Sequence, residues 1–279
     1  MYDYVVLDVF TRRPLEGNPL AVFLDATGIS DATMQRTARE LNLSETVFLL
    51  AGDADADARA RIFTPAAELP FAGHPVLGSG FVVGAATGKA EVTLRTGAGL
   101  VPVVLQREAE EIVYGEMAQP IPVLEAWDAE AELLRALGIA RSEVPVGAYR
   151  NGPLHVYVQL ADAAAVDALA PDLGALAALA VAGINCYAVA DGRAHTRNFS
   201  PALGVSEDPA TGSAAGPLAV HLATHGVIAW DTEIEIHQGV AMGRPSLLRA
   251  RASGRAERIE QVLVGGGAVE VAQGRYRLD

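Results

Sequence analysis

The sequence predicts an α+β fold made of two similar halves. Strand-like segments come in consecutive pairs and do not alternate strictly with helices, an order that is typical of α+β proteins. The chain also repeats itself. Three pairs of segments match in the same order, namely 61–66 with 197–202, 74–79 with 208–213, and 18–23 with 152–157. The first pair is 136 residues apart and the other two are 134 apart, which indicates an internal duplication with a two-residue deletion in one loop.

In the first half, each predicted element rests on its periodicity and its end signals. Ser30 caps a helix that runs to about residue 41 and has one apolar face. A second helix, at residues 76–86, is rich in small and apolar residues. The strands predicted from apolar runs are 4–10, 20–24, 43–50, 60–63, 90–94, 100–106 and 111–115.

The second half repeats this plan after a helix at residues 129–137. An alanine-rich stretch at 163–179 is largely helical, and Pro171 should break it. Another long helix of small residues runs from Asp208 to about His225. The predicted strands are 155–160, 184–190, 194–199, 233–237, 246–252 and 260–264, followed by a ribbon at 268–278. Each half is therefore expected to be a sheet with one long helix packed against it.

Length and duplication together favour two domains. The chain has 279 residues, enough for one large domain or two of ordinary size, and the repeat favours two. Residues 118–123 contain two prolines and are the best candidate for a linker. We therefore predict an N-terminal domain at 1–118 and a C-terminal domain at 124–279.

Composition narrows the classes of function. A formal net charge of −13 argues against nucleic acid or an anionic membrane as the main partner. No apolar run is long enough for a membrane span, and the strand pattern begins at once, so no signal peptide is expected. The single cysteine, Cys186, excludes an internal disulfide and a multi-cysteine zinc site. These features predict a cytoplasmic protein.

Residues 206–216 combine an acidic pair, a proline and a run of small residues. Asp208 fits the N-cap position of a helix and Pro209 fits its first turn, where a missing N–H costs nothing. The small residues let the helix start approach a ligand closely, and its free N–H groups favour an anion. A tightly packed buried helix with an ordinary cap would show the same pattern.

The repeat places His74 at the position equivalent to Asp208. If the halves face each other, the two helix N-termini converge on one cleft that suits a substrate carboxylate or an enolate. Two different titratable groups at equivalent places would then supply an acid and a base. Taken alone, His74 also fits a capping histidine, and Glu45, at the start of a strand, also fits a carboxylate that faces water.

Other polar or reactive residues are expected to be structural. Cys186 lies on a predicted strand and fits a small core residue. Arg61 and Arg197 occupy equivalent positions before a phenylalanine and are interpreted as structural anchors. His221 and His225 are spaced i and i+4 on one helix but lack the rest of a zinc motif, so no metal site is expected.

Three motifs resemble the signatures of the PhzF, or phenazine-biosynthesis-like, family. They are Ser-Glu-Thr at 44–46, Phe-Ala-Gly-His-Pro at 71–75 and Glu-Asp-Pro-Ala-Thr-Gly-Ser-Ala at 207–214. Further similar segments lie at 16–19, 149–153, 184–188, 236–239 and 243–246. The likeness covers nearly the whole chain, and the motifs together are highly specific although each alone would be weak.

The resemblance implies the diaminopimelate-epimerase-like fold. In that fold two pseudo-symmetric domains, each a sheet curled around a central helix, enclose an active site between them. It also implies a homodimer and a last strand that packs with the first domain. Its racemases and epimerases use one cysteine at each helix start, whereas this chain has His74 and Asp208 there, so a two-thiol racemase is not expected.

For the phenazine-forming members, the resemblance implies a cofactor-free isomerisation of trans-2,3-dihydro-3-hydroxyanthranilate. A proton moves between ring carbons, and the resulting enol becomes a reactive amino-ketone. Glu45 matches the family's acid/base, and burial in a dry cleft could raise its pKa toward neutrality. We expect His74 and Asp208 to bind the substrate's amino and hydroxyl groups. Further substrate contacts are expected from Ser44, from Gly73, Gly212 and Ser213 as donors to the carboxylate, and from Gln238 and Gly239 at the rim.

Three classes of function remain open at this point. The first is an isomerase of the phenazine type. The second is a cofactor-independent isomerase or epimerase of another small amino or hydroxy acid. The third is a non-catalytic dimeric binding protein that keeps the cleft. The presence of Glu45, His74, Asp208 and Ser213 argues against the third.

Overall fold

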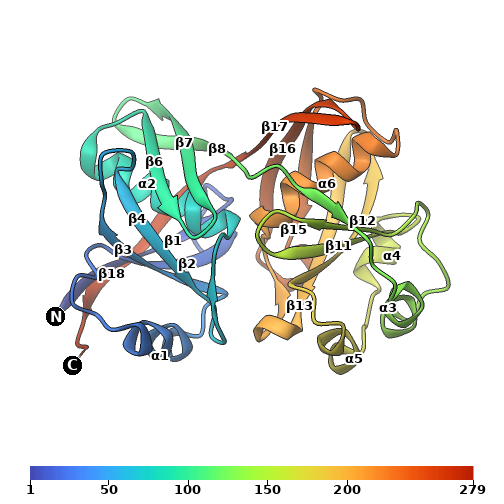
Figure 1. Ribbon diagram of the computed structural model, residues 1–279, viewed down its shortest axis with the longest axis horizontal. Helices are drawn as coiled ribbons and strands as arrows, with labels where there is room; N and C mark the ends of the chain where they lie inside the picture. The colour runs from blue at the N-terminus through green and yellow to red at the C-terminus, as the bar shows by residue number, and fades with distance from the viewer. Residues whose placement is uncertain (279) are drawn as a thin grey trace.

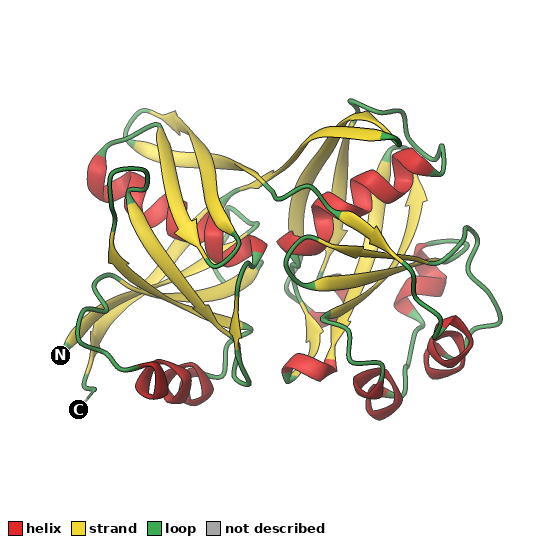
Figure 2. Ribbon diagram, viewed as in Figure 1, coloured by secondary structure: helices red, strands yellow, loops and turns green. Residues whose placement is uncertain are grey.

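The computed structural model describes residues 1–278, and it consists of two lobes that lie side by side (Figure 1). Each lobe is a curled mixed sheet that encloses one long helix, while shorter helices lie outside it (Figure 2). The strands of these residues form one continuous sheet of 18 strands. The predicted α+β class, with a sheet curled around a central helix in each half, is confirmed.

The first half is a sheet of eight strands with two helices. The strands are β1 (Tyr2–Val9), β2 (Asn18–Phe23), β3 (Glu45–Ala51), β4 (Ala58–Phe63), β5 (Glu68–Leu69), β6 (Glu91–Thr96), β7 (Gly99–Glu108) and β8 (Glu111–Ala118). Helix α1 (Asp31–Leu41) connects the parallel strands β2 and β3, and α2 (Gly73–Thr87) lies between the parallel strands β4 and β6. The other neighbours are antiparallel hairpins, which explains why strands follow one another in the sequence.

The second half repeats this topology. Its strands are β9 (Val123–Glu125), β10 (Gly147–Arg150), β11 (Leu154–Gln159), β12 (Gly183–Ala190), β13 (Arg193–Ser200), β14 (Val205–Asp208), β15 (Glu233–Gln238), β16 (Ser246–Arg255), β17 (Arg258–Gly266) and β18 (Ala268–Tyr276). Its helices are α3 (Glu130–Leu137), α4 (Ala163–Asp167), α5 (Leu173–Ala178) and α6 (Gly212–Thr224), with 3-10 turns η1 (Pro201–Leu203) and η2 (Val240–Met242). The predicted break near Pro171 falls between α4 and α5.

Two strand pairings tie the halves together. Strand β8 pairs with β17, so the sheet runs from one half into the other without a gap. The last strand, β18, leaves the second lobe and pairs along the whole of β1, from Tyr2 opposite Tyr276 to Val9 opposite Ala268 (Figure 1). Both ends of the chain therefore lie in the same lobe.

Helices α2 and α6 are buried on all sides. Every residue of α2 from Gly73 to Phe81 is buried, as is every residue of α6 from Gly212 to Ala223. A helix that is apolar around its whole circumference belongs inside a core rather than on a surface. Apolar side chains from both helices and from the strands of both halves form one continuous core. Smaller cores lie beneath α1 and beneath α3 to α5.

A proline inside α6 changes the hydrogen bonding of its first turn. Pro217 has no N–H, so the carbonyl of Ser213, four residues earlier, loses its helical partner. The side chain of Asn151 replaces it, since its Nδ2 donates to the Ser213 carbonyl at 2.9 Å. Gln119 Nε2 donates in the same way to the carbonyl of Gly212 at 2.7 Å. Side chains thus hold the start of α6 in place.

The structure corrects the alignment of the two repeats near the helix starts. Helix α6 begins at Gly212 with Thr211 as its N-cap, so the prediction of Asp208 as the N-cap and Pro209 in the first turn is wrong. Asp208 instead ends β14. The spacing from α2 to α6 is 139 residues, not 134, because the second copy has a longer loop that contains η1 rather than a deletion.

This correction changes which residues are equivalent. His74 is the second residue of α2, and Ser213 is the second residue of α6. Asp208 corresponds to Leu69, because Asp208 pairs with Asn198 on β13 just as Leu69 pairs with Ile62 on β4. The prediction that His74 and Asp208 occupy equivalent positions is therefore wrong.

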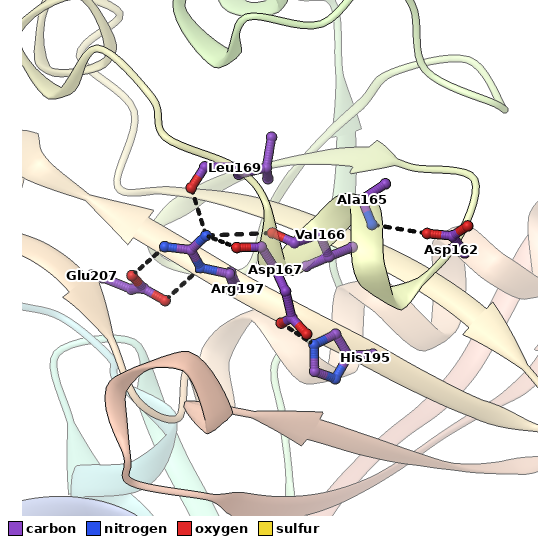
Figure 3. Close-up of polar contacts among 8 residues, drawn as sticks. All are labelled: Asp162, Ala165, Val166, Asp167, Leu169, His195, Arg197 and Glu207. Atoms are coloured by element: carbon purple, nitrogen blue, oxygen red, sulfur yellow. Dashed lines mark hydrogen bonds and ion pairs between the residues drawn. The ribbon is translucent and has the colours of Figure 1, made fainter.

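Arg61 and Arg197 are structural anchors at equivalent positions, as predicted. Each guanidinium lies over a phenylalanine ring two residues later and binds a glutamate, Glu68 or Glu207, with two hydrogen bonds. Arg197 also donates to the carbonyls of Val166, Asp167 and Leu169, and so fixes the chain that follows α4 (Figure 3).

Four short strands were absent from the sequence predictions. Strands β5, β9, β10 and β14 have two to four residues each and no periodicity of their own. They form because neighbouring strands offer them a partner, as β4 does for β5 and β13 for β14. The two end residues of the predicted linker at 118–123 are thus part of the sheet, since Ala118 ends β8 and Val123 begins β9.

Candidate active site

The starts of α2 and α6 meet at the boundary between the two halves. A Cβ on Gly73 would lie 2.3 Å from the carbonyl carbon of Gly212 and 2.4 Å from the nitrogen of Ser213. Only glycine permits two backbones to approach so closely. The predicted convergence of the two helix N-termini is therefore confirmed, and their free N–H groups make the junction suitable for an anion.

Asp208 lies beside this junction and receives hydrogen bonds from both halves. Its Oδ1 accepts from Ser44 Oγ at 2.8 Å and from Asn18 Nδ2 at 2.8 Å, while its Oδ2 accepts from Thr211 Oγ1 at 2.6 Å. The carboxylate is buried, with 7% of the residue exposed. Three donors on one buried carboxylate stabilise its ionised form.

Asn18 fixes the orientation of two neighbours at once. Its Nδ2 donates to Asp208 and to the carbonyl of Ala210, at 2.9 Å, so the amide nitrogen must face this side. The same nitrogen lies 3.2 Å from Nδ1 of His74. The two hydrogens of this amide go to Asp208 and Ala210, and its nitrogen cannot accept, so a proton on His74 Nδ1 would face a donor. We therefore assign the lone pair to His74 Nδ1 and the proton to Nε2.

Glu45 lies on the other side of His74. Its Oε2 is 3.5 Å from His74 Nε2 and has no hydrogen-bond partner among the described residues. Glu45 is the first residue of β3, where that strand begins its parallel pairing with Leu20 of β2. The start of the strand aims the carboxyl group at the junction, with its side chain only 14% exposed.

Burial perturbs the titration of all three groups. It raises the pKa of Glu45 well above its ordinary value of 4.5, and the charge of Asp208 raises that pKa further. Burial also raises the pKa of Asp208, but the hydrogen bonds from Thr211, Ser44 and Asn18 oppose the rise. Because Glu45 has no such donors, its pKa rises without this opposition, and a proton bound to the pair lies preferentially on Glu45 rather than on Asp208.

His74 is neutral in this setting. Burial lowers its pKa to about 3, so the contact with Glu45 is not an ion pair at neutral pH. Glu45, His74 and Asp208 thus belong to one chain of contacts, in which Asn18 lies between the neutral imidazole of His74 and the carboxyl group of Asp208. This arrangement suits proton transfer, because the groups differ in their affinity for a proton.

A small cavity of about 30 Å³ opens beside Glu45 and Asp208, whereas His74 lies behind them and is not among its lining residues. Among the predicted site residues, Ser44, Glu45, Asp208 and Ser213 line it, together with Thr211 and His155. This volume suits a water molecule or two and is too small for a six-membered ring.

The remaining predicted residues lie around this cavity. Gly73 and Gly212 form the helix junction behind it. Gln238 is buried behind Asp208, where its Nε2 donates to the Asp208 carbonyl at 2.7 Å and its Oε1 accepts from the Thr211 backbone at 3.1 Å. Gly239 follows Gln238 and packs against the carbonyl of Pro209. Gln238 and Gly239 thus support the Asp208 turn rather than line the cavity.

Sequence reasoning assigned no role to several residues that the structure brings to this site. They are Asn18, Gln119, Asn151, His155 and Thr211. Asn18 and Asn151 lie within segments that carried the family resemblance, and Thr211 lies within the third motif. His155 stands in a predicted strand, where nothing in the sequence distinguishes its side chain from an ordinary buried histidine.

Cys186 is a core residue, as predicted, and lies away from the site in the smaller core beneath α3 to α5. It is fully buried on β12, and burial raises the pKa of its thiol to about 12. Among the described residues there is no group of three or more His, Cys, Asp or Glu side chains placed to hold a metal ion. No helix in residues 1–278 is long and apolar enough to cross a membrane.

Comparison with known proteins places this site in a family. The model of the phenazine biosynthesis-like protein family matches residues 7–274. The chain belongs to this family. It is 51% identical over 278 residues to a trans-2,3-dihydro-3-hydroxyanthranilate isomerase from Pseudomonas aeruginosa, with 100% of each chain covered.

Solved structures agree with the family assignment. A phenazine biosynthesis protein of the PhzF family from Bacillus anthracis has a TM-score of 0.85 and 25% identity, with 99% of each chain covered. A hydroxyproline epimerase from Agrobacterium vitis has a TM-score of 0.70 at 14% identity, with 98% and 90% covered, and shares the fold alone. The diaminopimelate-epimerase-like fold that the resemblance implied is confirmed.

Proposed function

We propose that this protein isomerises trans-2,3-dihydro-3-hydroxyanthranilate by moving a proton between ring carbons, as a step in phenazine biosynthesis. The observation that carries the proposal is the line of Glu45, His74 and Asp208 in a buried cleft between two helix starts. Full-length identity of 51% to an isomerase of that name supports the choice of substrate.

Glu45 is the proposed acid and base. Once ionised, a carboxylate whose pKa is raised takes a proton from carbon more readily than an ordinary one, and it can return that proton to a second carbon on the same face of the ring. The proton that leaves the ring thus comes back to it, and the enol formed becomes an amino-ketone. No net redox change occurs, so this step requires no cofactor.

The neighbouring groups hold the ring against Glu45. The ionised Asp208 accepts a hydrogen bond from the substrate's amino or hydroxyl group, and His74 donates from Nε2. The N–H groups at the starts of α2 and α6, with the Ser213 hydroxyl, bind the substrate's carboxylate. Ser44 keeps Asp208 in place, while Gln238 and Gly239 hold the turn behind it.

The direct test is to follow the ring protons of trans-2,3-dihydro-3-hydroxyanthranilate by NMR in deuterium oxide with the purified protein. We expect isomerisation that is lost in Glu45→Gln, with partial deuterium incorporation set by how well the cleft excludes solvent. The matched control is Glu68→Gln, a glutamate of the same half that pairs with Arg61 and lies outside the cavity. A folded protein that leaves the substrate unchanged would contradict the proposal and indicate a different small acid.

We also propose that the protein is a cytoplasmic homodimer. Exposed apolar side chains support an assembly, among them Leu100 and Val104 on β7 and Val123 and Leu124 on β9. Light scattering after gel filtration should give twice the 29.1 kDa chain mass, and a monomer at micromolar concentration would contradict this assignment. Cell fractionation should find the protein in the cytosolic fraction.

A further inference from the structure

We infer that His155 is a positioning residue that turns the Ser213 hydroxyl toward the substrate's carboxylate and thereby sets substrate affinity. The inference rests on the proposed function, because it assumes that Ser213 binds the carboxylate. It adds a residue from the second half whose side chain is not part of the line through Glu45, His74 and Asp208.

The geometry that points to this role is a contact inside the cleft. His155 Nε2 lies 3.0 Å from Ser213 Oγ, and both residues line the cavity that Glu45 and Asp208 also line. The imidazole is buried, with 2% of the residue exposed. Its other nitrogen, Nδ1, is also buried and has no hydrogen-bond partner among the described residues.

A glycine on the adjacent strand makes room for this ring. His155 of β11 stands directly opposite Gly183 of β12 in the parallel ladder. A Cβ on Gly183 would lie 2.6 Å from His155 Nδ1 and 2.9 Å from Asn198 Oδ1, closer than real side chains allow. The ring thus occupies the space that any other residue at position 183 would fill.

This packing selects one tautomer of His155. Nδ1 forms no hydrogen bond with any described residue, Asn198 Oδ1 included, so a proton there would be buried and unpaired, whereas a lone pair there costs less. The proton therefore sits on Nε2 and is donated to Ser213 Oγ. With its oxygen lone pair engaged, the Ser213 hydroxyl is free to donate its own proton to an anion in the cleft.

The backbone of Ser213 is fixed independently. Asn151 Nδ2 donates to the Ser213 carbonyl at 2.9 Å and compensates for the N–H that Pro217 lacks. Ser213 is therefore held at its carbonyl by Asn151 and at its hydroxyl by His155. A donor held at two points binds an anion with less loss of entropy than a free hydroxyl rotor does.

His155 has no acid or base function at neutral pH in this arrangement. Burial lowers its pKa to about 3, so it stays neutral over the range in which the enzyme would work. Its effect should therefore appear in substrate binding, with kcat and the pH profile unchanged. This expectation separates a positioning residue from a catalytic one.

The test is a double-mutant cycle with steady-state kinetics on trans-2,3-dihydro-3-hydroxyanthranilate. We expect His155→Leu and Ser213→Ala each to raise KM by about 10- to 100-fold, the range for one hydrogen bond to a charged group, with kcat changed less than about threefold. The double variant should be no worse than Ser213→Ala alone, because His155 acts through Ser213. His155→Gln, which keeps a nitrogen near the Nε2 position, should restore most of the affinity.

A second variant guards against misfolding of the first. Gly183→Ala keeps the imidazole of His155 but displaces it, because the added Cβ would lie 2.6 Å from Nδ1. This variant should also raise KM, while its thermal unfolding stays cooperative. Additive losses in the double variant, a fall in kcat alone, or a shifted pH profile in His155→Leu would each overturn the inference. If Ser213→Ala leaves KM unchanged while the wild type turns over, the assumed role of Ser213 fails and the isomerase assignment stands.

Discussion

The two halves of this molecule share the same fold but differ in the side chains that they bring to the junction of α2 and α6. Each has a buried helix that begins with glycine at the junction, and each has an arginine that binds a glutamate beside a phenylalanine ring. At the second helix position, however, the first half has His74 and the second has Ser213. The first half adds Glu45 from a strand start, whereas the second adds Asp208 from a strand end.

This difference shows how a duplicated fold can support acid and base chemistry. A symmetric cleft with identical carboxyl groups would give both the same proton affinity in the empty protein. Here Asp208 receives three hydrogen bonds and Glu45 receives none. The unequal number of hydrogen-bond donors separates the pKa values of the two carboxyl groups. Both halves supply these donors, because Asn18 and Ser44 of the first half and Thr211 of the second half all bind Asp208.

Removal of the proton-carrying group should have the largest effect on activity. Glu45→Gln keeps the size and neutrality of the protonated side chain but cannot accept a proton. We expect kcat to fall by about 10²- to 10⁴-fold, the usual contribution of a general acid/base, with little change in substrate affinity. Isothermal titration with the variant measures binding directly, and near-normal kcat would contradict the role of Glu45.

The two arginine anchors offer a comparison of stability. Arg197→Ala should lower the free energy of unfolding by about 2–4 kcal/mol, because Glu207 and the carbonyls of Asp167 and Leu169 lose the donor that Arg197 supplies, while the Val166 carbonyl keeps the N–H of Leu169 (Figure 3). Arg61→Ala should cost about 1 kcal/mol, since its partners Asp31 and Glu68 have side chains that are 82% and 43% exposed. Urea unfolding of both variants measures the difference, and equal losses would show that the anchors are energetically equivalent.

Asn18 of the first half forms a hydrogen bond with Asp208 of the second half, and its loss should reduce activity. In Asn18→Leu, Asp208 loses one of its three donors and His74 loses the neighbour that fixes its tautomer. We expect kcat/KM to fall by about 10- to 100-fold, as for one hydrogen bond to a charged group. Asn185→Leu is the control, because Asn185 is also a buried asparagine but forms no hydrogen bond with Asp208 or His74. A control that loses as much activity would assign the effect to packing.

The smallest expected effect is on the pH dependence of stability. The folded pKa of Glu45 lies above its unfolded value, so the folded state binds more protons and loses stability as pH rises from about 4.5 toward that raised value. Glu45→Gln has no such loss. Its Tm should therefore exceed that of the wild type by a margin that grows from pH 5 to pH 8, by roughly 2–4 °C per 1 kcal/mol. A constant margin would contradict the raised pKa.

The sequence predicted the fold and most of the site, for identifiable reasons. Long strands and the two small-residue helices have strong periodicity, and the repeat predicted that their N-termini converge. The equivalence of His74 and Asp208 was wrong because Asp208-Pro209 has the sequence of a helix start. The Asp208 carboxylate instead turns toward Ser44 and Asn18 of the other half, and the helix begins four residues later.

Contacts between distant segments were beyond the reach of sequence patterns. Asn18 lies 190 positions from Asp208, and His155 lies 58 positions from Ser213. Their roles depend on side-chain orientations that the sequence does not specify. The need for glycine at position 183 becomes visible only when the pairing of β11 with β12 places it opposite His155. Gln238 was expected at the rim, and its amide instead forms hydrogen bonds behind Asp208.

Glu45 is expected to hold the proton of the carboxyl pair while Asp208 holds the charge. The most direct measurement is a carboxyl ¹³C NMR titration of protein labelled at glutamate and aspartate side chains, with Glu45→Gln and Asp208→Asn to assign the signals. We expect the titration step on Glu45 to occur well above pH 4.5 and at a higher pH than the step on Asp208. An ionised Glu45 at pH 5, or a proton that leaves Glu45 before Asp208, would contradict this expectation.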